Sequence, residues 1–464
     1  MTDVDVVQKL WGFCNTLRDE GMSYGHYIEQ LTYLLFLKMA DERNMPIPEE
    51  YNWKSVVEKT GMELLEHYQE CLKNLAKEGG ILADIFAGAL SQFREPVNLK
   101  KLIGMIDRER WSAIDVDIKG AAYEGLLQKY AADEKGAGQY FTPRELIRAI
   151  VKCIDPKIGE TIHDPGLGTG GFLLGALEYI LKETNEGADL TREQNEFLLK
   201  KTFSGNELVL ETKRLAMMNI YLHGIEADVY YGDSLGEGPH VGRKHKVIMT
   251  NPPFGIKSGG VTPTRSDFNV TTSNKQLNFV QHVMSALENG GRAAMVAPDN
   301  VLFDSGAGTQ IRKILLEDFD LHTILRLPIG TFTPYSPGVK ANVIFFDKPG
   351  PTKAVWIYDL RTDIDKITKK EGITEEHFDE FIELYQNRKE TGRFKRFSIA
   401  EVKKRDYNLD IFWLKSKDFD AGEYEEPEVI LEAIKESEER IIDEIDRIMG
   451  VLVNENGKGE RKAT

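Results

Sequence analysis

Hydrophobic residues in the first 130 positions of the chain recur at the spacing of an α-helix. Four stretches show this pattern, namely 10–17, 27–39, 56–72 and 81–93. Apolar residues such as Leu10, Cys14 and Leu17 return every third or fourth position and so share one helix face, whereas a half-buried strand would alternate every second position. We therefore predict an all-helical domain over residues 1–130.

The pattern changes after about residue 135, where short runs of β-branched and apolar residues alternate with helical segments. We predict strands at 161–163, 202–204, 229–231, 247–249, 292–296, 323–327 and 342–346. Helices are predicted between them, notably at 172–184, 211–224 and 276–287. Such alternation is typical of a parallel sheet covered by helices. The expected fold class is α/β, with a Rossmann-like, seven-stranded and mostly parallel sheet in a domain over residues 131–413.

After residue 413 the chain becomes acidic and keeps a helical pattern. Apolar residues step by three and four positions, with Glu438 as an interruption, at Leu431, Ile434, Ile441, Ile445, Ile448 and Leu452. Such a seam is typical of a helix that packs against another helix. It fits packing against the chain's own body and contact with a partner equally well. We predict a helical tail over residues 414–464 that serves subunit assembly.

The charge of the chain narrows the choice of partners. Its 464 residues include 59 Lys and Arg against 75 Asp and Glu, a formal net charge of −16. Contacts from Lys and Arg dominate nucleic-acid binding, so a chain that held DNA alone would normally be basic. If DNA is the substrate, either the positive charge is local or a partner supplies much of the contact.

Cysteine usage and the N-terminus indicate the compartment. Cys14, Cys71 and Cys153 lie far apart in the sequence, which favours a reducing environment over a disulfide framework or a zinc site. No stretch approaches the ~20 apolar residues of a membrane helix. The N-terminus carries acids where a signal peptide would carry bases. We expect a bacterial-type cytoplasmic location, no membrane contact and no metal.

A glycine-rich segment directly follows the first predicted strand and runs His163-Asp164-Pro165-Gly166-Leu167-Gly168-Thr169-Gly170-Gly171-Phe172. Glycines at a strand-to-helix turn let the backbone approach a bound nucleotide, although a plain turn without a ligand is the alternative. After the next strand, Glu207 can accept hydrogen bonds from both hydroxyls of a ribose. Its distance from the glycines exceeds the ~20 residues of a dinucleotide fold, which argues against NAD.

The tetrapeptide Asn251-Pro252-Pro253-Phe254 follows the apolar run 247–249. Two prolines cannot extend a central strand, so the tetrapeptide ends the strand at the edge of the sheet where ligands gather. The Asn251 side-chain oxygen and the Pro252 carbonyl could accept both hydrogens of an adenine amino group, and Phe254 could stack on a flipped base. The positioned nitrogen can then attack a methyl group in line. A simple Pro-Pro turn is the alternative.

Two further segments are candidate cofactor contacts. In Gly138-Gln139-Tyr140-Phe141-Thr142-Pro143-Arg144, Thr142 and Pro143 are expected as the N-cap and first residue of a helix. Tyr140, Phe141 and nearby backbone groups could also cover one end of a cofactor. Asp233, after the third predicted strand, could accept a hydrogen bond from a cofactor amino group, although acids at such positions more often form turns.

The order of these motifs resembles that of adenine N6-methyltransferases of the gamma arrangement. Over nearly its full length the chain is similar to the modification (M) subunit of type I restriction–modification systems, including its segments 327–332 and 342–346. The resemblance implies a class I methyltransferase fold and transfer of methyl from S-adenosylmethionine to adenine in DNA. It assigns cofactor binding to Gln139, Tyr140, Phe141, Thr142, Pro143, Arg144, Asp164, Gly166, Thr169, Gly170, Gly171, Glu207 and Asp233, and catalysis to Asn251, Pro252, Pro253 and Phe254. Gly166-Leu167 departs from the family's small residues or cysteine but leaves Thr169–Gly171 intact.

The resemblance also bears on the acidic charge. In this family two M subunits assemble with one specificity (S) subunit that reads the DNA sequence, and a restriction (R) subunit can join them. We expect local contacts with DNA from Lys257, Arg265 and Lys275, in or beside the Gly-, Ser- and Thr-rich stretch 255–274. We also expect this stretch to become ordered on DNA, with an ordinary solvated loop as the alternative.

Three other functions remain open at this stage. Asn-Pro-Pro-aromatic sequences also serve methylation of RNA guanine and of protein glutamine, although those enzymes usually lack the long N-terminal helical domain. A non-catalytic scaffold subunit that binds the cofactor is the second, and the intact Asn251, Pro252 and Phe254 argue against it. A nicotinamide-dependent oxidoreductase is the third and rests only on the glycines.

Overall fold

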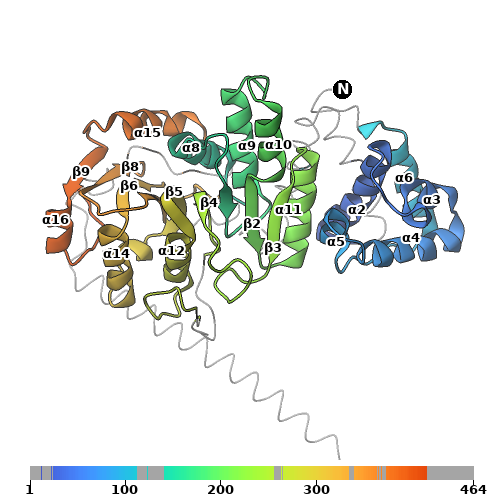
Figure 1. The fold of residues 1–464 in the computed structure, drawn as a ribbon, viewed down its shortest axis with the longest axis horizontal. Helices are drawn as coiled ribbons and strands as arrows, with labels where there is room; N and C mark the ends of the chain where they lie inside the picture. Colours follow the sequence, from blue (N-terminus) through green and yellow to red (C-terminus); the bar gives the residue numbers. More distant parts are fainter. Residues whose placement is uncertain are drawn as a thin grey trace, which may run out of the picture. The chain divides into compact units, whose positions relative to one another are not determined.

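The computed structural model describes residues 24–111, 141–254, 265–333, 339–362 and 372–414, together with Gly12, Met22, Tyr123, Pro263, Ile364 and Ile367. The chain divides into two compact units, residues 1–412 and 413–464, and the elements described below belong to the first (Figure 1). The predicted helical seam between residues 431 and 452 lies outside the described residues.

The described N-terminal region consists of helices. They are α2 (Tyr24–Glu42), η1 (Glu49–Tyr51), α3 (Trp53–Glu58), α4 (Gly61–Leu75), α5 (Ile81–Phe86) and α6 (Pro96–Asp107). Their apolar faces form one cluster that includes Leu34, Trp53, Leu72 and Ile103. Helical periodicity therefore predicted this region correctly, although of the expected stretch 10–17 only Gly12 is described.

Two of the predicted helical stretches are shorter than expected because the backbone turns. The stretch 56–72 is divided, since α3 ends at Glu58 and α4 begins at Gly61, whose φ is +59°. The stretch 81–93 ends as a helix at Phe86, and Gly88 follows with φ +67°. Both glycines adopt a left-handed conformation that other residues reach only at a cost.

Among the described residues, one nine-stranded sheet has the order β3-β2-β1-β4-β5-β7-β6-β8-β9. Its strands are β1 (Ile162–Asp164), β2 (Phe203–Glu207), β3 (Ala227–Tyr231), β4 (His245–Thr250), β5 (Leu287–Pro298), β6 (Asp320–Arg326), β7 (Ala341–Asp347), β8 (Ala354–Asp359) and β9 (Phe394–Ser398). β7 runs antiparallel to β5 and β6, and β9 runs antiparallel to β8, whereas the other pairs are parallel.

The α/β class and the mostly parallel pairing agree with the sequence, and the strand count does not. β1 to β7 overlap the seven predicted strands, and β8 and β9 extend the sheet beyond them. β9 is an edge strand that carries Lys395 and Arg396 on exposed positions. An edge strand has little buried surface, so its sequence lacks the apolar alternation on which strand prediction depends.

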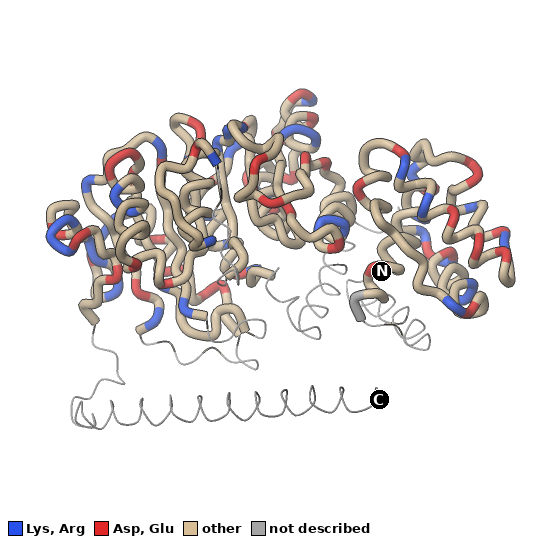
Figure 2. Tube along the Cα trace, turned by 90° about the horizontal axis from the view of Figure 1, so that it is seen from below, with Lys and Arg blue, Asp and Glu red and all other residues tan. Residues whose placement is uncertain are grey.

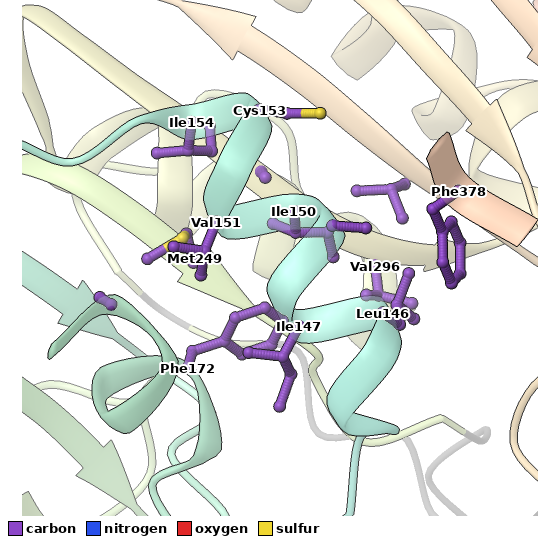
Figure 3. Packing of buried hydrophobic residues seen from close by; sticks show 14 of the residues in the cluster. Leu146, Ile147, Ile150, Val151, Cys153, Ile154, Phe172, Met249, Val296 and Phe378 are labelled. Atoms are coloured by element: carbon purple, nitrogen blue, oxygen red, sulfur yellow. The ribbon is translucent and has the colours of Figure 1, made fainter. Parts of the chain in front are cut away.

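The helices of the chain after residue 141 pack against the sheet. They are α8 (Arg144–Ile154), α9 (Gly171–Glu183), α10 (Arg192–Lys200), α11 (Leu210–Leu222), α12 (Lys275–Ala286), α13 (Asn300–Phe303), α14 (Ala307–Glu317), α15 (Glu376–Asn387) and α16 (Ile399–Lys404). Figure 3 shows the apolar residues of α8, including Ile147 beside Phe172 of α9. A Cβ on Gly171 or Gly175 would lie 2.8 or 2.5 Å from side-chain carbons of Ile147, so both glycines permit the close approach of α8 and α9.

α11 joins the N-terminal helices to the sheet. Every residue from Thr212 to Leu222 is buried. Leu215, Met218 and Tyr221 belong to the apolar cluster of the N-terminal helices, whereas Ala216 and Ile220 belong to the cluster on the sheet. Arg214 forms an ion pair with Glu29 of α2, and Lys213 pairs with Asp84 of α5 at 2.6 Å. A single helix thus supplies side chains to two cores.

The described residues also bear on the sequence predictions about membrane helices, cysteines and metal ligands. No helix within the described residues is long and apolar enough to cross a membrane. Cys71 and Cys153 are buried and carry free thiols. Nowhere in the described part of the chain do three or more His, Cys, Asp or Glu side chains form a group that could hold a metal ion.

Candidate active site

A cavity opens at the carboxyl ends of the parallel strands β1, β2 and β4, beside the turn that follows β3. Of the residues predicted from sequence, its lining contains Phe141, Thr142, Arg144, Asp164, Gly166, Thr169, Gly171, Glu207, Asp233, Asn251 and Pro253. Parallel neighbouring strands end at the same edge of a sheet, which explains how the motifs that follow β1, β2, β3 and β4 meet. Gln139 and Tyr140 lie outside the described residues.

The glycine-rich turn forms the floor between β1 and α9. Gly168 and Gly170 have φ values of +54° and +85°, which favour glycine. A Cβ on Gly166 would lie 3.1 Å from the Thr250 hydroxyl oxygen and 3.4 Å from Cα of Pro252. Gly170 itself does not line the cavity but turns the chain into α9. The turn is therefore packed directly against the start of the tetrapeptide.

Glu207 ends β2, and both of its carboxylate oxygens accept backbone hydrogen bonds. The Gly168 amide donates to Oε2 at 3.0 Å and the Val209 amide donates to Oε1 at 2.8 Å. Burial raises the pKa of Glu207 to about 6. Each carboxylate oxygen can accept a second hydrogen bond, so the group is held in place and can still receive two hydroxyl donors.

Asp164 and Asp233 are the other carboxyl groups of the cavity. Asp164 is buried, accepts a hydrogen bond from the Gly166 amide at 2.9 Å, and has a pKa that burial raises to about 7. Asp233 accepts a hydrogen bond from the Leu235 amide at 3.0 Å. Asp233 therefore forms a turn, as such acids usually do, and also lines the cavity.

Asn251 is held by a contact that the sequence did not predict. Its Nδ2 donates to the Thr142 hydroxyl oxygen at 2.9 Å. Its Oδ1 is buried and has no hydrogen-bond partner among the described residues. The expectation that Thr142 is a helix N-cap is wrong, because Pro143 occupies the N-cap and α8 begins at Arg144. The threonine hydroxyl is directed to the asparagine instead of to the helix.

The rest of the tetrapeptide surrounds Asn251. Pro253 lines the cavity, and its carbonyl accepts a hydrogen bond from the Gln276 side chain at 3.5 Å. Pro252 is buried against the glycine turn. The ring of Phe254 is half-buried and meets Phe332 edge to face, with ring centroids 5.7 Å apart. Pro252 and Phe254 lie outside the cavity lining.

Several cavity residues were missed from sequence, notably Asn206, Leu208, Ser234, Leu235 and Phe279. Asn206 and Leu208 flank Glu207, and Ser234 and Leu235 follow Asp233, so adjacency to those acids was the available signal. The Nδ2 of Asn206 is buried without a partner in the described part of the chain. Phe279 carried no local signal, because an aromatic residue in a buried helix usually belongs to a core.

The three cations expected to contact DNA have different surroundings. Lys275 is half-buried and lines the cavity at the start of α12. Arg265 is buried and paired with Asp267, so its expected role as a DNA contact is wrong. Lys257 lies outside the described residues, as do residues 255–262 and 264 of the stretch 255–274 that was expected to become ordered on DNA.

Comparisons with known proteins identify the family. A family model for N-6 DNA methylases matches residues 114–417, and a model for the HsdM N-terminal domain matches residues 6–46. The chain is 38% identical to the type I restriction enzyme StySPI methylase subunit of Salmonella potsdam and 37% identical to the EcoKI methylase subunit of Escherichia coli K12. Each alignment covers 97% of this chain and 96% of the relative.

Solved structures agree with the sequence comparison. The EcoKI M protein is 34% identical and superposes with a TM-score of 0.58 over 97% of this chain and 96% of that one. A chain from a study of complex assembly and conformational transition of the type I R-M system is 30% identical, with a TM-score of 0.76 over 98% of this chain and 99% of that one. The chain belongs to the N-6 DNA methylase family and, within it, to the methylase subunits of type I restriction enzymes.

Proposed function

We propose that the cavity binds S-adenosylmethionine and that Asn251–Phe254 hold an adenine, flipped out of DNA, against its methyl group. The observation that carries this assignment is the buried Asn251 Oδ1, which has no partner among the described residues although Nδ2 of the same amide is fixed by Thr142. A buried acceptor without a donor is costly, so a ligand that donates a hydrogen bond is favoured there. An adenine amino group is such a donor.

The lining fits S-adenosylmethionine. Glu207 offers two oxygens to the ribose hydroxyls, and Asp233 stands at the adjacent wall as an acceptor for the cofactor's adenine amino group. Asp164 contributes negative charge toward the cationic methionine end. Leu208 and Phe279 supply apolar surface. We also assign Phe141, Thr142, Pro143, Arg144, Gly166, Thr169, Gly170 and Gly171, together with Gln139 and Tyr140, to cofactor binding.

The chain's own residues contribute orientation and hydrogen bonding. When bound, S-adenosylmethionine supplies a methyl group on a positively charged sulfur. Asn251 Oδ1 and the Pro252 carbonyl accept the two amino hydrogens, which localises the nitrogen lone pair toward that methyl group. Phe254 stacks on the base, supported by the edge of Phe332. Transfer of that methyl group to the nitrogen would leave the bonding electron pair on the cofactor's sulfur, and the surplus proton of the amino group would pass to water.

We assign three functional parts to the chain: a helical domain over 1–130, the methyltransferase domain over 131–413, and an assembly tail over 414–464. A specificity subunit, a second copy of this chain and a restriction subunit are the proposed protein partners, and DNA is the substrate. The net charge of −16 supports a division of labour in which a partner supplies much of the DNA contact. Buried free thiols at Cys71 and Cys153 are consistent with a cytoplasmic location.

Methyl transfer tests the assignment. The complex that the chain forms in its host is purified, and labelled methyl transfer from S-adenosylmethionine to DNA is measured for the wild type and for Asn251→Ala. We expect adenine methylation in the wild type and a loss of about 100-fold or more in the variant, with cofactor affinity retained. Asn195→Ala, on an exposed position of α10, is the matched control and should behave as the wild type.

The other outcomes separate the alternatives. Cofactor binding by the wild type without transfer to DNA would redirect the search to RNA guanine or protein glutamine, with the same Asn251→Ala comparison. Full activity of Asn251→Ala would remove the asparagine from the mechanism. A wild type that does not bind S-adenosylmethionine would contradict the assignment of the cavity.

A further inference from the structure

Arg265 lies in a buried network beside the cofactor cavity. Its side chain is 1% exposed and pairs with Asp267, with Nε donating to Oδ1 at 2.8 Å and Nη2 donating to Oδ2 at 2.5 Å. A fork-to-fork pair of this kind neutralises the guanidinium and fixes its plane. Ser285 donates a further hydrogen bond to the Asp267 carboxylate. The contacts with Asp267 therefore also fix the direction in which the remaining nitrogen, Nη1, can donate.

Nη1 of Arg265 donates to the Ser234 carbonyl at 2.7 Å and lies 2.8 Å from Nδ1 of His282. A guanidinium has only donors, so Nδ1 of His282 must be the acceptor and the imidazole is neutral. Burial, with the Arg265 charge, lowers the pKa of His282 to about 3, in agreement with that assignment. Nε2 of His240 lies 3.1 Å from the same Ser234 carbonyl and, facing an acceptor, carries its proton there.

Ser234 is part of the cavity wall, between Asp233 and Leu235. Its hydroxyl donates to the Pro165 carbonyl in the glycine turn at 2.6 Å. The turn 233–235 is thus attached to the glycine turn through its hydroxyl side and to Arg265 through its carbonyl. A shift of this turn moves Asp233 relative to Glu207, and hydrogen bonds weaken steeply when their geometry is lost.

Arg265 follows the tetrapeptide by 11 residues in the sequence. A structural role alone would require only the pair with Asp267. The bond to Ser234 adds a constraint on the cavity itself, and Arg265 has no position in the cavity lining through which to touch a ligand directly.

We propose that Arg265 is a positioning residue for cofactor binding, which holds the turn 233–235 in the geometry that S-adenosylmethionine requires. The inference rests on the proposed cofactor site. It names a determinant of affinity that acts through a backbone carbonyl, without contact to the cofactor or to DNA.

The test compares two buried arginines. Arg265→Met removes the donors and keeps an apolar stem. Arg312→Met is the matched control, because Arg312 is equally buried and donates to the Tyr407 and Val301 carbonyls at 2.8 and 3.1 Å, away from the cavity lining. Affinity for S-adenosylmethionine is measured by titration calorimetry, with the thermal midpoint of each variant recorded alongside. We expect Arg265→Met to weaken cofactor binding at least 10-fold and Arg312→Met to change it less than 2-fold.

Steady-state kinetics of the complex provide the second readout. A positioning role predicts a raised KM for S-adenosylmethionine with kcat at saturation within about threefold of the wild type. Arg265→Lys keeps the charge opposite Asp267, but a single ammonium cannot reproduce the fork that also reaches Ser234. It should bind the cofactor more weakly than the wild type, and it serves as the test if Arg265→Met does not fold.

Wild-type affinity in the folded Arg265 variants would overturn the inference, as would an equal loss of affinity in Arg312→Met. Failure of the proposed cofactor site is a different result, because the wild-type chain itself would then show no binding of S-adenosylmethionine.

Discussion

The amide of Asn251 has a defined orientation because Thr142 is beside it. The hydroxyl accepts from Nδ2, which leaves Oδ1 directed away from Thr142 and without a partner among the described residues. The two residues are 109 positions apart in sequence. Sequence motifs identified both residues as parts of a site, but only the folded chain brings the hydroxyl to the amide. Contacts of this kind cannot be predicted from local patterns, which contain no information about distance between motifs.

Thr142→Val tests this contact. The substitution keeps the shape of the side chain but removes the acceptor, so the Asn251 amide can rotate away from its productive orientation. One hydrogen bond contributes about 1 kcal/mol, which corresponds to a loss of roughly 5-fold to 10-fold in kcat. Thr142→Ser keeps the hydroxyl that accepts from Asn251 and should restore the rate. Equal rates for the Val and Ser variants would contradict the assigned orientation.

The carboxyl groups of the cavity predict how stability depends on pH. An unfolded Asp has a pKa of about 3.9, whereas burial raises the pKa of Asp164 to about 7. Between these values the native state binds more protons than the unfolded state. The contribution of Asp164 to the free energy of unfolding of the cofactor-free protein should therefore fall as pH rises from about 4 to about 7 and level off above it. The buried His245 and His282, whose pKa values burial lowers, contribute in the opposite direction. The difference in the free energy of unfolding between the wild type and Asp164→Asn, measured by urea unfolding at several pH values, isolates the contribution of Asp164.

Cofactor binding should show the opposite trend. S-adenosylmethionine carries a positive charge that ionised Asp164 attracts, and ribose hydroxyls that donate more strongly to ionised Glu207. Its affinity should therefore rise as both groups ionise, across the range from about 6 to about 7 set by their raised pKa values. Calorimetric titrations at pH 5.5 and pH 8 give the comparison. An affinity that does not change between the two, in the wild type, would contradict the roles assigned to Asp164 and Glu207.

At the scale of elements, prediction from sequence succeeded where burial leaves a pattern. β1, β2 and β4 to β7 are largely buried and were found from short β-branched and apolar runs, whereas β3, at the other edge of the sheet, has no buried residue and was found from the run 229–231. β8 also had a usable signal in the apolar run 354–358, whereas β9 is charged and lies at the edge. The split of 56–72 into α3 and α4 lies at Lys59 and Thr60, whose backbones are extended, and at Gly61, whose φ is +59°, within an otherwise continuous helical pattern. Periodicity reports the faces that are buried and does not report such breaks.

The contact between α8 and α9 gives a prediction at this scale. A Cβ on Gly175 would lie 2.5 Å from Cγ2 of Ile147, so Gly175→Ala must push two packed helices apart. Overpacking of this kind typically costs about 1–3 kcal/mol. Gly104→Ala is the control, because Gly104 lies inside α6 and a Cβ added there would meet no atom of the described residues within 4 Å. That substitution should stabilise the protein by roughly 0.5–1 kcal/mol.

Chemical denaturation of both variants measures these effects. The double variant Gly175→Ala with Ile147→Ala removes the clash and should recover part of the lost stability, although it also deletes buried apolar atoms. If Gly175→Ala and Gly104→Ala change the free energy of unfolding in the same direction, the close approach of the two helices is not the reason for the glycine.

At the scale of the whole molecule, the distribution of charged residues bears on how the chain contacts DNA. Lys and Arg are interspersed with Asp and Glu along the described chain (Figure 2). One of the three cations expected to contact DNA, Arg265, is buried in an ion pair. The cavity lining contains Lys275 and Arg144 as its basic residues, alongside three acids. The acidic balance of the sequence favours a partner that supplies phosphate contacts, which stays a prediction, whereas the expected DNA contact from Arg265 is wrong.

DNA binding by the isolated chain should be weak and only modestly salt-dependent. Each phosphate neutralised by Lys or Arg releases counterions, so affinity falls with salt in proportion to the number of such contacts. We expect a smaller slope of log K against log salt for the isolated chain than for its complex with a specificity subunit. Fluorescence anisotropy of labelled DNA between about 50 and 200 mM salt measures both slopes. Equal affinity and equal slope would mean that this chain supplies the phosphate contacts itself.

Because α11 contributes side chains both to the core of the N-terminal helices and to the core on the sheet, we expect that neither part folds stably without the other. A helix whose residues from Thr212 to Leu222 are all buried has no face to present to water, and two cores depend on it. A fragment beginning at residue 141 would carry Leu215, Met218 and Tyr221 as a bare apolar stripe and should aggregate. Any replacement of the N-terminal helices therefore has to match the side chains that α11 contributes to their core.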